Sequence, residues 1–239
     1  MPAETTNLFL VEDLEDISRT SKLADSDLDS LRIVADWINT FITQQHKELG
    51  RIGPVCPFVP GSLERQALWL ATEHIANQSV ANLVQLVNDY KALLLRAEPR
   101  EADAIYKSIL VVFTDVSAER ADDDLNDVHV QDLNQPAYAD DGIVLGRFHG
   151  RNEGSAVRNP DFHPFQAPIP FLLMRLAVTG DWVFFLDNED WFNTWARRWA
   201  SPQSKPWRWN YASPTGARAK RDTAAKLNAN QTGEGNRSG

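Results

Sequence analysis

One seven-residue run constrains the fold more than any other part of the chain. Residues 108–114 read Ser-Ile-Leu-Val-Val-Phe-Thr, and nearly all of them are apolar or β-branched. Side chains of a strand point alternately to the two faces of its sheet, so a continuous apolar run is typical of a strand buried on both faces. The run therefore predicts an inner strand of a covered sheet, in a chain whose 239 residues can bury a sizeable core.

Three stretches carry apolar residues at helical spacing. The first is expected to begin at Ser26 or Asp27, whose side chains can accept hydrogen bonds from the free amides of a helix start, and to end near Gly50. The second and third are expected to begin at Ser79 and Ser117. These stretches predict helices that pack on the sheet.

Shorter apolar runs predict the other strands, at residues 67–71, 142–149 and 171–178, and residues 8–11 could add one short pairing from the arm that precedes the domain. The run at 67–71 is short enough that a helical turn stays open. The fold class that follows is an α/β (α+β) sandwich, with a mostly antiparallel sheet of about four strands and helices packed on it. We expect an acidic mobile arm over residues 1–25, a single globular domain over 26–211 and a disordered basic tail over 212–239.

Composition excludes several function classes. The net charge is −9, from 24 basic and 33 acidic residues, and this charge disfavours nucleic acid as a partner. The single cysteine, Cys56, excludes an internal disulfide and a thiolate-cluster metal site, and it fits a reducing compartment. No secretory leader pattern and no apolar run near the ~20 residues of a membrane span are visible, so we expect a cytoplasmic protein.

The polar stretch 146–175 holds the best candidate site. If residues 142–149 form a strand, Arg147 and His149 share one face and Phe148 takes the other. A guanidinium can bind a carboxylate or a phosphate, and an imidazole can bind a metal or move a proton. With Arg158 and His163 these residues predict a site for an anionic small molecule. The alternative is that both histidines are loop residues that hydrogen-bond the backbone.

Two other features have a functional and a plainer interpretation. Cys56 precedes a proline, which can leave a thiolate free for a metal, but apolar Val55 and Phe58 favour a buried structural thiol. The run of aspartates at positions 122 to 124 cannot converge on one ion, because neighbouring helical positions point about 100° apart. We expect this run to face solvent.

A last helix is predicted from Asn188. It carries Trp191, Trp195 and Trp199 at every fourth position. Such a stripe is most often a docking face within the protein, and the alternatives are a partner surface or a membrane interface.

Four separated motifs resemble an uncharacterised domain family of bacteria and fungi. They are Cys-Pro-Phe-Val-Pro from Cys56, the strand that ends in Asp115, Gly-Arg-Phe-His from Gly146, and the Asn-Pro-x-Phe segment from Asn159 with its later prolines. The resemblance covers roughly residues 51–186. The chain departs from the family's pattern at Gly150, where a proline is usual, and at Ala167, where a serine is usual.

That family is in turn distantly similar to the YqcI/YcgG-type haem proteins, which share a Pro-Cys-x-Phe segment and an arginine-rich His-Pro segment. This similarity implies a haem-binding oxidoreductase of secondary (natural-product) metabolism that oxidises an amine nitrogen of an amino-acid-like substrate. His149 would then be the axial iron ligand, Arg147 and Arg158 would face the propionates, Cys56 would belong to the cofactor site, and His163 would be catalytic.

Two further function classes stay open beside the haem hypothesis. One is a cofactor-free enzyme or ligand-binding protein, in which His149 and His163 act as acid–base groups on a carboxylated small molecule. The other is an accessory partner protein that docks through the tryptophan helix. A homodimer is an open assembly for all of these classes.

Overall fold

The computed structural model describes residues 7–127, 141–178, 180–181, 193–194 and 196–198. The chain divides into two units, Met1–Asp181 and Trp182–Gly239. The sheet and the helices that pack on it belong to the first unit. In the second unit, residues 193–194 and 196–198 are helical, and the predicted stripe of Trp191, Trp195 and Trp199 lies outside the described residues.

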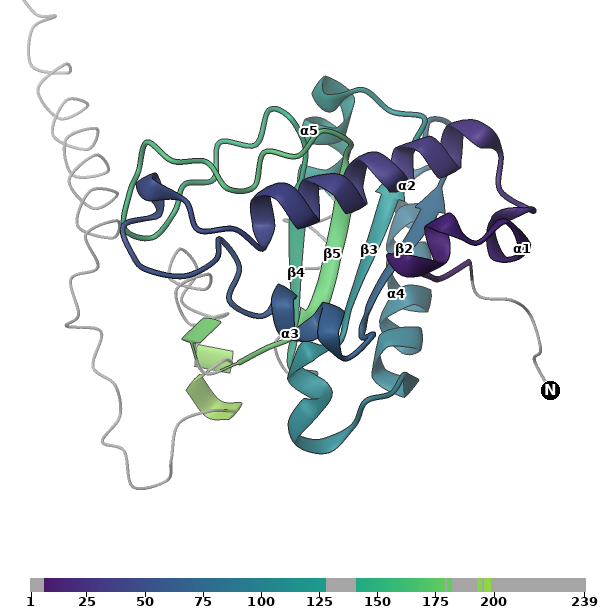
Figure 1. Cartoon of the computed structure of the whole chain (residues 1–239). Coiled ribbons are helices and arrows are strands. Elements are labelled where there is room, and N and C mark those ends of the chain that lie inside the picture. Colours follow the sequence, from purple (N-terminus) through teal and green to yellow (C-terminus); the bar gives the residue numbers. More distant parts are fainter. Residues whose placement is uncertain (1–6, 128–140, 179, 182–192, 195, 199–239) are drawn as a thin grey trace, which may run out of the picture. The chain divides into compact units, whose positions relative to one another are not determined.

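The first unit is built on a five-stranded sheet (Figure 1). The strands lie in the order β1-β2-β3-β5-β4, with the bounds β1 Phe9–Leu10, β2 Leu68–Glu73, β3 Ser108–Phe113, β4 Ile143–Phe148 and β5 Phe171–Leu176. All six residues of the middle strand β3 are buried, in agreement with its continuous apolar run. The predicted α+β fold with a mostly antiparallel sheet is confirmed, with five strands rather than about four.

Three of the strands end at the same edge of the sheet. β2 and β3 are parallel, whereas β5 is antiparallel to both β3 and β4, so β4 runs in the direction of β2 and β3. The register places Thr72, Val112 and Phe148 in one row across the sheet, with Phe171 between the last two. We call the end of the sheet just beyond this row the carboxyl edge. In open α/β sheets, ligands commonly bind outside the carboxyl ends of strands.

One face of the sheet is covered by α2 (Asp25–Trp37), which continues into a π-helical turn, η2 (Ile38–Ile42). Its buried stripe follows helical spacing, and each fully buried Leu, Ile or Val contributes about 1.5–3 kcal/mol to the folded state. The core on this side contains Leu31, Val34, Ile38, Leu68, Leu70, Leu110, Val112, Phe148 and Phe171.

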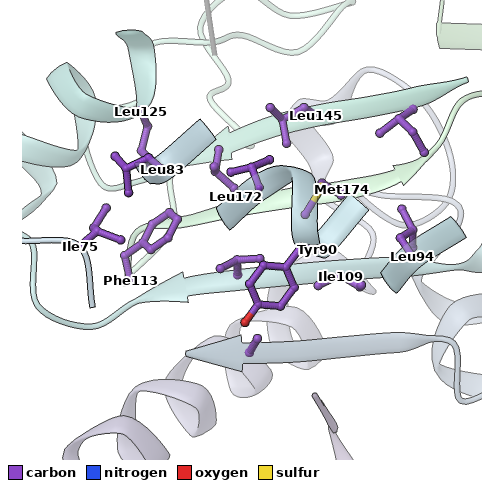
Figure 2. Packing of buried hydrophobic residues seen from close by; sticks show 14 of the residues in the cluster. Ile75, Leu83, Tyr90, Leu94, Ile109, Phe113, Leu125, Leu145, Leu172 and Met174 are labelled. Carbon is purple, nitrogen blue, oxygen red and sulfur yellow. The ribbon is translucent and has the colours of Figure 1, made fainter. Parts of the chain in front are cut away.

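The other face is covered by α4 (Val80–Arg96) and α5 (Ala118–Asp127). Figure 2 shows this core, in which side chains from both helices meet the second face of the same strands. It contains Ile75, Leu83, Tyr90, Leu94, Ile109, Phe113, Leu125, Leu145, Leu172 and Met174. The two cores explain why β3 is apolar at every position after Ser108.

Short helices connect the larger elements: η1 (Glu12–Glu15), α1 (Ile17–Thr20), η3 (Lys47–Leu49), α3 (Val59–Glu64) and η4 (Glu101–Tyr106). Three early elements lie in the stretch that we predicted to be a mobile arm. From Phe9 onward this stretch folds, because β1 adds an antiparallel strand to β2 and Leu14 is buried under α2.

The starts and ends of the helices differ from the predictions at α2. This helix begins at Asp25 after Ala24, which provides no side-chain cap, and it gives way to η2 long before Gly50. Asp27 therefore lies inside the first turn and does not cap it. At α4 the prediction holds, since the Ser79 hydroxyl accepts a hydrogen bond from the Asn82 amide at 3.2 Å.

Candidate functional site

Polar residues follow all three strands that end at the carboxyl edge. His74 follows β2, Thr114 and Asp115 follow β3, and His149 follows β4. The Asp115 carboxylate accepts hydrogen bonds from the amides of Ile75 at 2.8 Å and Ala76 at 2.9 Å, which joins the chain after β2 to the end of β3. The edge thus carries two histidines, His74 after β2 and His149 after β4, with β3 and β5 between these two strands.

The alternation predicted around His149 is present. Phe148 packs on the α2 side, where its ring stacks on Phe171 at 4.6 Å between centroids. His149 lies toward α5 on the other side, with Nε2 3.5 Å from Oδ1 of Asp122. Asp122 was predicted to face solvent with the rest of its aspartate run, and it does so only in part, because its side chain is 45% exposed and lies beside the imidazole.

The His149 imidazole is fully buried, and neither ring nitrogen has a hydrogen-bond partner among the residues that the structure describes. Burial lowers its pKa below the ordinary value, and the cations Arg147 and Arg151 act in the same direction, while Asp122 opposes them. The ring is therefore neutral at neutral pH. A neutral imidazole can accept a proton or bind a metal through a ring nitrogen.

Asn152 fixes the chain that follows His149. Its side-chain nitrogen donates to the Arg147 carbonyl at 2.9 Å, and its side-chain oxygen accepts from the backbone amide of Gly154 at 2.8 Å. The side chain of Gln166, from the far arm of the loop, donates to the Asn152 carbonyl at 3.3 Å. These bonds hold the backbone on both sides of His149 in one arrangement.

The contacts of the other two predicted residues of the polar loop, His163 and Arg158, are with residues other than His149. His163 lies with Nδ1 3.1 Å from the Glu153 carbonyl, so its ring connects two arms of the loop. Arg158 is exposed, and its Cβ lies close to Gly50, where an added Cβ would come within 3.1 Å of it. A positive φ of 72° at Gly50 also favours glycine there.

Cys56 lies near the opposite end of the sheet. Its thiol is half-buried and lies near Arg175. Burial of this guanidinium lowers its pKa, but the hydrogen bonds to Asp181, with a smaller effect of Cys56, raise the pKa above the ordinary value. Arg175 aligns with Ser108 and Val144, at the beginnings of β3 and β4, whereas His149 follows the end of β4. The structure therefore does not bring Cys56 together with His149.

Sequence reasoning missed a second group at the carboxyl edge. Oδ1 of Asp27, in the first turn of α2, lies 3.0 Å from Nε2 of His74 and accepts a hydrogen bond from the Thr114 hydroxyl at 2.7 Å. A cavity of about 750 Å³ adjoins this group and is lined by residues of β1, α1, α2 and the end of β2. The sequence signal for this group is a polar residue directly after each of two strands, His74 after β2 and Thr114 after β3. This signal can be recognised only when β2 and β3 are known to be parallel.

A family model for a domain of unknown function, DUF6875, matches residues 31–209. The chain belongs to this family. No curated protein and no solved structure matches the chain. The predicted membership of an uncharacterised domain family is thus confirmed, and the more distant similarity to haem proteins stays a prediction.

The described part of this DUF6875 chain lacks two features. None of its helices combines the length and the apolar character that crossing a bilayer requires. Within the same residues, no three His, Cys, Asp or Glu side chains are grouped as ligands of one metal ion.

Proposed function

We propose that the chain is a small-molecule enzyme or ligand-binding protein in which His149 acts as the acid–base group on a carboxylated ligand. The supporting observation is the buried imidazole whose two nitrogens have no hydrogen-bond partner. A buried polar group without a partner costs about 1–3 kcal/mol, and such groups in native proteins usually serve a site or meet a bound molecule. A purely structural role would therefore not explain why a destabilising buried histidine is present at position 149.

Asp122 marks the side from which a ligand could reach the ring. Its carboxylate is partly exposed, and the 3.5 Å between Oδ1 and Nε2 of His149 is long for a strong hydrogen bond. At 3.5 Å no atom fits between the two groups, so a ligand hydroxyl or amine would reach Nε2 only after the Asp122 side chain turned outward, and it would then bridge the two groups. The ligand's proton would pass to the neutral imidazole, and the Asp122 carboxylate would stabilise the imidazolium that forms.

Arg147 and Arg151 supply positive charge beside this position, since both lower the pKa of His149. Arg151 also lies 3.7 Å from Glu119 on the surface of α5, and both side chains are well exposed, so solvent screens this pair. Guanidinium groups bind carboxylates through paired hydrogen bonds. The proposal therefore assigns the ligand's carboxylate to this arginine pair.

The predicted haem does not fit His149 in this arrangement. An axial ligand needs open space beside one ring nitrogen for the porphyrin, whereas both nitrogens are enclosed and the Asp122 side chain occupies the space next to Nε2. Haem on His149 would require Asp122 and part of α5 to move. The haem-dependent oxidoreductase therefore stays a prediction, which the experiment below tests.

A thermal-shift screen tests the proposal. The probes are the proteinogenic L-amino acids and short-chain mono- and dicarboxylates, each added to the full chain. We expect at least one to raise the melting temperature of the wild type and to lose this effect in His149→Gln and Arg147→Gln. His163→Gln is the matched control, because that ring bonds the loop backbone, and it should respond like the wild type.

Two outcomes would overturn the proposal. If every stabilising carboxylate acts equally on His149→Gln, the site lies elsewhere. If the chain incubated with haem shows a Soret band that His149→Gln loses, the imidazole is an iron ligand and the arrangement of Asp122 in the haem-bound protein differs from the one described above.

A further inference from the structure

The second group at the carboxyl edge is built by three elements that are distant in sequence. His74 follows the last residue of β2, and Thr114 follows the last residue of β3. These last residues, Glu73 and Phe113, pair with each other, so His74 and Thr114 are neighbours across the sheet. Alternation puts both on the face under α2, whose first turn provides Asp27 (Figure 1). The close contacts among the three residues thus follow from the parallel pairing of β2 and β3.

The contacts orient the histidine. The Thr114 hydroxyl and His74 both bond the same oxygen of Asp27, whose carboxylate is 12% exposed, while the His74 side chain is 62% exposed. A carboxylate held by a hydroxyl and bonded to one ring nitrogen is an arrangement that orients histidines in catalytic and binding sites. It leaves Nδ1 of His74 as the ring nitrogen that does not face Asp27.

The electrostatics favour a charged His74. The hydrogen bond to Asp27 raises the pKa of His74, and the nearby carboxylates of Asp115 and Glu73 act in the same direction. Burial opposes ionisation of Asp27, but the hydrogen bonds from His74 and Thr114 hold its pKa below the ordinary value. Both shifts favour an imidazolium at His74 beside the ionised carboxylate of Asp27.

The lining of the adjoining cavity adds further positive charge. Arg19 and Lys22 line it together with Asp27, Glu73 and His74. Arg19 is paired with Asp13 at 2.9 Å, and Glu73 accepts a hydrogen bond from the Tyr90 hydroxyl at 2.6 Å. Lys22 is exposed, and among the described residues no ion pair involves it. Lys22 and the Nδ1 side of His74 are thus the positively charged or donating groups that a ligand can meet in this lining, beside the Glu73 carboxylate.

We infer that this cavity is a second small-molecule site, which binds an oxyanion, a carboxylate or phosphate group, between Lys22 and the Nδ1 side of His74. The cavity volume of about 750 Å³ lies within the usual range of small-molecule sites. The ligand's oxyanion would accept the Nδ1 proton as a charge-assisted hydrogen bond, while Asp27 and Thr114 keep the ring in place. The site is separate from the one at His149, which lies on the opposite face of the sheet.

The test is a titration of the full chain with inorganic phosphate and, in parallel, with acetate, at constant low ionic strength. The carbon-bound ring protons of His74 report binding by NMR. We expect a saturable shift with at least one probe, and affinity lower by about threefold or more in Lys22→Gln. Binding should also weaken as the pH rises from about 6 to about 8, because the imidazolium loses its proton.

Lys47→Gln is the matched control, since Lys47 is another exposed lysine that does not line the cavity. It should bind like the wild type, and so should His149→Gln, which separates this inference from the function proposed above. A response that is absent, that does not saturate, or that is equally strong in Lys22→Gln would overturn the inference. Saturation by only one of the two probes supports it and identifies the oxyanion.

Discussion

The two histidines of the carboxyl edge are similar in position and opposite in character. Each follows the last residue of a strand, and each has an aspartate from a helix beside Nε2: Asp27 of α2 for His74, and Asp122 of α5 for His149. His74 is well exposed and has a raised pKa, whereas His149 is fully buried and has a lowered pKa.

The comparison shows that a neighbouring carboxylate alone does not set the charge of a histidine. At 3.0 Å the hydrogen bond between Asp27 and His74 outweighs the partial loss of hydration. At 3.5 Å Asp122 makes no such bond, and the loss of hydration around the enclosed ring prevails. At this one edge the surroundings therefore favour the charged form of His74 and the neutral form of His149.

The largest effect should come from breaking the His74 pair. Asp27→Ala leaves His74 and the Thr114 hydroxyl without their acceptor, and we expect a loss of about 1–3 kcal/mol in the free energy of unfolding. The pKa of His74 should fall toward its ordinary value. Urea unfolding and an NMR pH titration measure the two effects.

Asp25→Ala is the matched control for this substitution. Asp25 lies in the same first turn of α2 and is exposed, so its removal takes away the same charge from the helix start without breaking the pair. Equal losses in the two variants would mean that the contacts with His74 and Thr114 do not stabilise the fold.

A smaller loss is expected for Thr114→Val, which keeps the shape of the side chain and removes one hydrogen bond to Asp27. We expect a loss of about 0.5–1.5 kcal/mol in the free energy of unfolding. The double variant Asp27→Ala/Thr114→Val should be less destabilised than the sum of the single variants, because both lose the same bond. Strict additivity would show that the hydroxyl does not support the carboxylate.

The other histidine should behave differently. His149→Leu removes two buried polar atoms that have no partner, so we expect a protein that is as stable as the wild type or more stable, by up to about 1 kcal/mol. Urea unfolding measures this change. Phe148→Leu, at the adjacent apolar and buried position, should instead lose about 1 kcal/mol through a cavity. A large loss in His149→Leu would show that the ring has partners that stabilise it, such as bound water.

The fold was largely predictable because its signals are local. The apolar run of β3, the Ser79 cap and the stripe of α4 each depend on residues that are close in sequence. The end of α2 was not predictable in this way, because apolar residues continue at helical spacing into η2 while the backbone changes to a π-helical turn. The parallel pairing of β2 with β3 depends on residues about 40 positions apart, beyond any local pattern.

The candidate site was predictable only where one strand carries it. Alternation alone placed Arg147 and His149 opposite Phe148, but no spacing rule linked His149 to Asp122 or His74 to Asp27, since each pair joins a helix to the end of a strand. Asp27 looked like a capping residue because aspartate is common at helix starts. Its role as the acceptor for His74 and Thr114 follows from tertiary packing.

The smallest effect, and the sharpest test of the comparison, is the pH dependence of stability. His74 has a raised pKa in the folded chain, so its contribution is fully present below the ordinary histidine value and is lost as the pH rises through the raised value. His149 has a lowered pKa, so the unfolded chain binds the extra proton, and stability falls as the pH drops from the ordinary value toward the lowered one. As the pH rises, the free energy of unfolding of the wild type should therefore fall relative to that of His74→Gln. Over the same rise in pH, it should increase relative to that of His149→Gln. Urea unfolding at a series of pH values between about 5 and 8 measures both differences, and slopes of the same sign would show that the two histidines do not differ in the way their surroundings indicate.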